Sequence, residues 1–152
     1  MMKFEIVKKD MTSNTNEKYF TNDKSFDCVP AVNVDINLAI AYLNLGVDSE
    51  DMCIKCLWGF SPMESWKEEK LCVPKAEEGV LKLVGEYESG LTWRIDDDNM
   101  WESFFDKNSG WYCIGKNTCA DMDKAVNIID NMIAVLDAND ELKAIWVKPE
   151  FV

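Results

Sequence analysis

The sequence of residues 81–114 reads LKLVGEYESGLTWRIDDDNMWESFFDKNSGWYCI. Two short polar segments, 88–90 and 106–110, interrupt its apolar and aromatic runs, and both have the length and the glycine of hairpin loops. The four strands expected on this basis cover residues 81–87, 91–95, 101–105 and 111–114. Successive hairpins predict an antiparallel meander.

Residues 119–136 follow the hairpins and carry apolar side chains at three- and four-residue spacing. Thr118 can cap a helix here, and Asp121 falls in the first turn, where the helix dipole favours a negative charge. The spacing predicts a C-terminal amphipathic helix over residues 119–136.

Residues 35–45 fit two patterns. Their apolar side chains alternate as in a strand, yet Ile36, Ile40 and Leu43 also share one helical stripe between Asp35 and Gly46. The alanine and leucine content and the terminal glycine favour a helix, and the strand is the alternative. The expected fold class is therefore α+β, with both helices packed on one face of the meander.

The remaining chain completes a single expected domain over residues 1–152. Residues 3–9, 52–60 and 142–148 read as strands, whereas residues 10–27 are polar and predict a long or mobile loop. Charges interrupt every apolar run near the start, so no signal-peptide core is seen, and no later stretch is long enough to span a bilayer. We expect a cytoplasmic protein.

The charge of the chain points to binding. It has 28 acidic and 16 basic residues, no histidine and a net charge of -12. Residues 76–152 hold 16 acidic against 7 basic residues, and residues 1–75 hold 12 against 9. Such a surface favours a cationic partner and disfavours nucleic acid and anionic membranes.

Aromatic residues are interleaved with the acids of residues 81–114. Tryptophan can supply buried area and cation–π contact to lysine or arginine, whereas the alternative is that these rings belong to the core. The candidate partner-binding residues are Glu86, Glu88, Trp93, Asp96, Asp97, Asp98, Trp101 and Glu102.

No catalytic residue, cofactor or metal is predicted. A serine or cysteine triad lacks its histidine, and the glycines form no phosphate-binding loop. Cys53 and Cys56 lie three apart on an expected strand, so their side chains should point to opposite faces. A four-thiolate site that adds Cys28 and Cys72 is the alternative.

In its general profile, small, acidic and without a catalytic set, the chain resembles bacterial immunity proteins that neutralise toxin domains. This resemblance is one of composition and implies an inhibitor. We expect an acidic protein that covers a basic surface of another protein, such as a nuclease-type toxin. A carbohydrate- or small-molecule-binding domain with a tryptophan-lined pocket is the alternative, and self-association through the aromatic face is a third.

Overall fold

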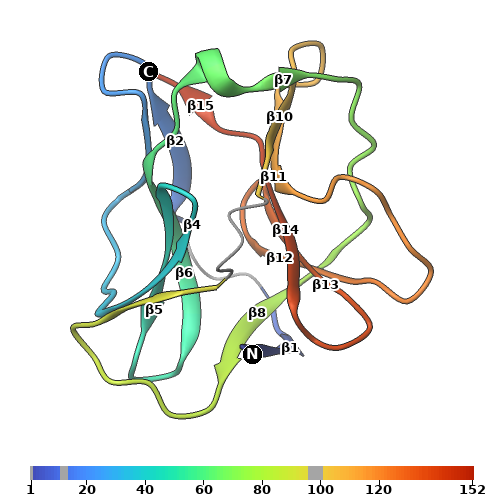
Figure 1. The fold of residues 1–152 in the computed structure, drawn as a ribbon. Helices are drawn as coiled ribbons and strands as arrows, with labels where there is room; N and C mark the ends of the chain where they lie inside the picture. Colours follow the sequence, from blue (N-terminus) through green and yellow to red (C-terminus); the bar gives the residue numbers. More distant parts are fainter. Residues whose placement is uncertain (1, 11–13, 96–100) are drawn as a thin grey trace.

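A computed structural model of the protein describes residues 2–10, 14–95 and 101–152. The described chain is nearly all β, and its strands form one mixed sheet that curls into a half-barrel (Figure 1). The strands are β1 (Lys3–Lys8), β2 (Asn16–Phe20), β3 (Ser25–Val29), β4 (Ile36–Ile40), β5 (Leu43–Asp48), β6 (Cys53–Phe60), β7 (Lys67–Glu68), β8 (Glu77–Val84), β9 (Thr92–Arg94), β10 (Ser103–Asp106), β11 (Trp111–Gly115), β12 (Lys124–Ile129), β13 (Met132–Leu136), β14 (Leu142–Val147) and β15 (Glu150–Phe151). A 3-10 turn, η1, covers Met63–Ser65.

The main path through the sheet runs β15-β2-β3-β6-β8-β12-β13-β14-β11-β10-β7. Strand β1 also pairs with β8, while β5, β4 and β9 extend the sheet from β6. Figure 1 shows β2, β4, β5 and β6 on one side of the curl and β10 to β14 on the other. Among the described residues, no helix has the length and apolar character that a membrane span requires.

The expected C-terminal helix over residues 119–136 is wrong, and the α+β fold class with it. Strands β12 and β13 form an antiparallel hairpin, in which Ile129 pairs with Met132 across the turn at Asp130 and Asn131. Asn131 has a φ of 60°, a left-handed conformation that asparagine tolerates better than most residues. Every residue of β13 is buried, because its two faces pack in two different core clusters. A strand that is apolar on both faces matches helical spacing as well as alternation, and this misled the prediction.

The helix expected over residues 35–45 is also a hairpin. Strands β4 and β5 pair antiparallel, with Ile40 opposite Leu43 across the turn at Ala41 and Tyr42. Gly46 does not end a helix. It lies in β5 under Val34, where a Cβ atom would come within 2.7 Å of the Val34 Cγ1 atom. The glycine is required for this close approach.

The meander expected over residues 81–114 is half correct. Strands β10 and β11 form the second hairpin, with Phe104 opposite Cys113. Strands β8 and β9 are not partners: β8 pairs with β1, β6 and β12, whereas β9 pairs in parallel with β4. The sheet is thus mixed, and not a simple antiparallel meander. Residues 10–27, expected as a loop, contain β2 and the start of β3.

An aromatic cluster joins the two sides of the curl. Phe26 on β3 lies 4.9 Å from Tyr112 on β11, measured between ring centroids, and Trp66 lies 4.8 Å from the same tyrosine. Tyr19 on β2 packs against both Phe26 and Trp66. Trp66 and Trp146 are buried, so part of the tryptophan content belongs to the core.

Candidate functional site

The structure describes five of the eight predicted contact residues. Asp96, Asp97 and Asp98 lie outside the described residues. Glu86 and Glu88 are exposed on the connection between β8 and β9. Their side chains are therefore available to a partner.

The three other predicted residues have different surroundings. Trp93 on β9 is half-buried, and its ring packs edge-on against Tyr87 at 5.3 Å between centroids. Trp101 is half-buried just before β10, and the neighbouring Glu102 forms an ion pair of 2.7 Å with Lys67. The carboxylate of Glu102 is thus already compensated within the chain. The predicted residues therefore fall into two groups. Glu86, Glu88 and Trp93 lie on the β8–β9 connection and β9, whereas Trp101 and Glu102 lie beside β10 and β7.

Sequence reasoning missed a second acidic segment that the fold brings beside Glu86 and Glu88. The turn between β5 and β6 meets the β8–β9 connection at one end of the sheet (Figure 1). The N–H of Gly90 donates to the carbonyl of Asp35, and the N–H of Leu83 donates to the carbonyl of Met52 at 2.8 Å. We call this surface the acidic end; it consists of Asp35, Asp48, Glu50, Asp51, Glu86 and Glu88.

Most carboxylates of the acidic end form no ion pair with any residue that the structure describes. Asp51 forms an ion pair of 2.7 Å with Lys55. Partial burial works to raise the pKa of Asp51, but the hydrogen bond from Lys55 and the Cys53 N–H outweigh it and lower the pKa. Within the described chain, the other five carboxylates form no ion pair.

Asp35 is fixed by the neighbouring turn. Its carboxylate accepts a hydrogen bond from the Ser49 hydroxyl and one of 2.8 Å from the Ser49 N–H, and both lower its pKa. This pairing ties the start of β4 to the turn after β5. The acidic end is therefore a charged surface on a hydrogen-bonded framework.

A hollow beside Trp101 bears on the alternative of a tryptophan-lined pocket. It has a volume of about 590 Å³ and lies between the end of β11 and the start of β14. Trp101 is the tryptophan in its lining, and an ion pair between Asp123 and Lys143 forms part of its wall. A single tryptophan beside charged residues offers less surface for stacking against a sugar ring than the tryptophan-lined pocket that the alternative predicts.

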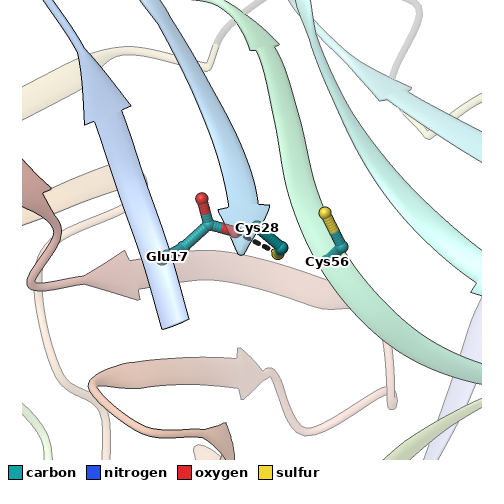
Figure 2. A group of neighbouring side chains, drawn as sticks. All are labelled: Glu17, Cys28 and Cys56. Atoms are coloured by element: carbon teal, nitrogen blue, oxygen red, sulfur yellow. Dashed lines mark hydrogen bonds between the residues drawn. The ribbon is translucent and has the colours of Figure 1, made fainter. Parts of the chain in front are cut away.

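A second candidate site lies inside the protein, where three strands bring together one carboxyl group and two thiols (Figure 2). Glu17 on β2 stands opposite Cys28 on β3, and Cys56 lies on the adjacent strand β6. One ligand atom from each of the three residues lies within 4.8 Å of the other two. Glu17 is 3% exposed, and both cysteines are buried. We call these three residues the buried cluster.

Burial controls the protonation of the buried cluster. The Cys28 thiol donates to Glu17 Oε1 at 3.0 Å, and the Leu57 N–H donates to the same oxygen at 2.9 Å. Loss of water raises the pKa of Glu17 to about 8, although these two hydrogen bonds work to lower it. The hydrogen bond with Cys56, burial and the nearby Glu17 raise the pKa of the Cys28 thiol. Glu17 and Cys28 are thus largely uncharged at neutral pH.

Cys53 and Cys56 diverge on β6, as expected. Cys53 Sγ lies 3.6 Å from the carbonyl oxygen of Asp51, whereas Cys56 joins the buried cluster. Cys72 is exposed and outside the cluster, so the four-thiolate alternative is not formed. Sequence reasoning missed Glu17 because residues 10–27 were assigned to a loop. Glu17 is itself polar and lies between Asn16 and Lys18, so no apolar alternation marked this strand in the sequence.

Comparison with known proteins adds no identification. No protein-family model matches the chain, and no curated protein is significantly similar to it. Function is therefore inferred from the chemistry of the residues alone.

Proposed function

We propose that the protein binds a basic partner protein through its acidic end, as an inhibitor that covers a cationic surface. The observation that supports this most is the convergence of Glu50, Glu86 and Glu88 with Asp35 and Asp48, none of which is ion-paired in the described chain. A cationic active site, such as that of a nuclease-type toxin, offers the complementary charge.

The two kinds of side chain at this surface have different roles. Exposed carboxylates steer a basic protein and raise the association rate, because their attraction acts over about 8 to 10 Å at ordinary salt. Apolar groups slow dissociation by burial. The apolar groups beside the acids are Leu91, which is 44% exposed, and the half-buried Tyr87 and Trp93. Their burial against the partner would slow dissociation of the complex.

The test compares two variants that each lose three negative charges. The first is Glu50→Gln, Glu86→Gln and Glu88→Gln, at the acidic end. The matched control is Glu5→Gln, Asp23→Asn and Asp121→Asn, at exposed sites elsewhere. Each immobilised chain captures proteins from extract of its native cell, and mass spectrometry identifies those whose binding is lost in 0.5 M salt.

We expect the wild-type chain and the control to retain a basic protein that the acidic-end variant loses. With that partner purified, the dissociation constant of the acidic-end variant should rise at least about tenfold, or about 1.4 kcal/mol. An acidic partner, indifference to 0.5 M salt, or equal losses in the two variants would count against the proposal.

The hollow beside Trp101 supports the alternative function, a carbohydrate- or small-molecule-binding domain. A ligand that binds only the native state raises the unfolding temperature. A thermal-shift screen against sugars, with Trp101→Ala as the comparison, distinguishes the two functions. A shift that depends on Trp101 and not on the acidic-end variant would favour the hollow.

A further inference from the structure

The buried cluster has the composition of a metal site. Two thiols and a carboxylate are ligands for zinc and similar cations that accept both sulfur and oxygen donors. Glu17, Cys28 and Cys56 come from three hydrogen-bonded strands, so the positions of the donors are set by the sheet and not by mobile loops. Their ligand atoms already lie within 4.8 Å of one another.

A second feature of the cluster points to a missing ligand. Glu17 Oε2 is buried and has no hydrogen-bond partner in the described part of the chain, while Oε1 accepts two hydrogen bonds. Buried carboxyl oxygens in native proteins are normally paired with a donor or a cation. Oε1 is the oxygen that faces Cys28 (Figure 2), so a cation held by both oxygens of the carboxylate would satisfy Oε2.

A fourth donor lies at the solvent side of the cluster. Asp27 precedes Cys28 on β3 and is exposed. Its Oδ1 atom lies 3.9 Å from Cys56 Sγ and accepts the Cys28 N–H at 2.8 Å. Its carboxylate is not among the three ligand atoms that lie within 4.8 Å of one another, so three ligands of a tetrahedral zinc ion are in place and the fourth is supplied by Asp27 after a turn of its side chain, or by water.

We propose that Glu17, Cys28 and Cys56, with Asp27 at the entrance, bind one zinc ion per chain. The ion joins strands β2, β3 and β6, which pair in sequence as neighbours in the sheet. On binding, the thiols and the carboxyl group release their protons to solvent and become anionic ligands. None of these residues belongs to the acidic end, so this proposal is independent of partner binding.

The first test uses Cd²⁺ as a spectroscopic probe of the full chain, reduced and freed of metal by a chelator. Titration should give a thiolate-to-cadmium absorption band that saturates at one equivalent. Cys28→Ser and Cys56→Ser should each lose most of the band, and Glu17→Gln should weaken affinity at least about tenfold, a typical size for loss of a metal ligand or its orienting partner.

Cys72→Ser and Cys119→Ser are the matched controls, because both cysteines are exposed and outside the cluster. They should keep the full band and the wild-type rise in unfolding temperature on addition of zinc. Loss of the band in these controls, or its retention when both Cys28 and Cys56 are replaced, would overturn the proposal.

A second measurement needs no substitution and so does not depend on the folding of a variant. X-ray absorption of the zinc-loaded wild-type chain should show two sulfur neighbours at about 2.3 Å, with oxygen in the remaining positions. A shell of oxygen alone, four sulfurs, or no retained zinc would contradict the site.

Discussion

Glu17 and the acidic end show two opposite fates of the same chemical group. The Glu17 carboxyl lies between three strands, receives one N–H and one thiol, and has its pKa raised to about 8 by burial. Glu86 and Glu88 stand in water without an ion pair in the described chain. The formal net charge of -12 counts every acidic side chain as ionised. Glu17 is largely neutral at pH 7, so it adds little to the negative electrostatic potential of the surface.

Asp106 shows what Glu17 lacks. It is also buried, at 7% exposure, yet its carboxylate accepts backbone N–H groups from Leu71 and Asn108 at 3.0 Å each and from Ser109 at 3.3 Å. The Leu71 N–H and the two turn N–H groups lower the pKa of Asp106 although burial works to raise it. Asp106 thus receives three N–H donors where Glu17 receives one, and these donors favour its charged form.

The largest expected effect comes from the titration of Glu17. Its pKa in the folded chain, about 8, lies above the ordinary value of 4.5, so the folded state holds the proton more tightly. The stability this provides is fully present below pH 4.5 and is lost as the pH rises through 8. The loss is on the order of a few kcal/mol.

Urea unfolding of the metal-free chain between pH 5 and pH 9 measures this effect. Glu17→Gln should flatten the decline in the free energy of unfolding, because a glutamine side chain does not titrate. Glu5→Gln, an exposed control, should keep the wild-type profile. The groups that face Glu17 are Cys28 and Asp27 on β3 and Cys56 on β6. If the free energy of unfolding of Glu17→Gln declines as much as that of the wild type, the pH dependence belongs to these neighbouring groups and not to Glu17.

Asp106→Asn should have a smaller effect of opposite sign. A lowered pKa means that the charged form stabilises the fold above the ordinary pKa of 3.8, and that this stability is lost as the pH falls through the lower, folded-state value. Asparagine keeps one oxygen for the N–H donors but removes the charge, so the variant should be less stable at pH 7. Its deficit should shrink in acid. A deficit independent of pH would indicate that only packing at the β10–β11 turn was lost.

The smallest effect is expected at the acidic end itself. Glu50→Gln, Glu86→Gln and Glu88→Gln together should change the free energy of unfolding by less than about 0.5 kcal/mol, as exposed substitutions usually do. Relief of repulsion between the acids would give the change a stabilising sign. Chemical denaturation at low and high salt measures it. A large destabilisation would show that these acids hold the β8–β9 connection in place.

Local strand patterns could be predicted from the sequence. Residues 3–9, 52–60 and 142–148 were expected as strands and contain β1, β6 and β14. The hairpin of β10 and β11 was expected around a loop at residues 106–110, and Asp106 proves to be the last residue of β10. A glycine-bearing loop marks the turn between β10 and β11, and β14, although buried on both faces, is short and ends before Pro149. Residues 119–136 failed because β13 is buried on both faces, which erases the two-residue period.

The candidate sites depended on contacts between distant segments. Glu86 and Glu88 were chosen as candidates because they lie among aromatic residues in the sequence. The acids of the turn at residues 48–51 come close to them only because β4, β5 and β6 pair in the sheet. Glu17 could not be placed, because an acid is expected in water unless its strand partners are known. Its neighbours Cys28 and Cys56 lie 11 and 39 residues further along the chain.

Hydrogen–deuterium exchange of the protein bound to its captured basic partner tests the central claim most directly. Binding through the acidic end predicts new protection of backbone amides at residues 48–52 and 83–91, with residues 118–124 unchanged. Protection confined to residues 118–124 and 137–143 would contradict binding through the acidic end and would place the binding surface at the hollow beside Trp101.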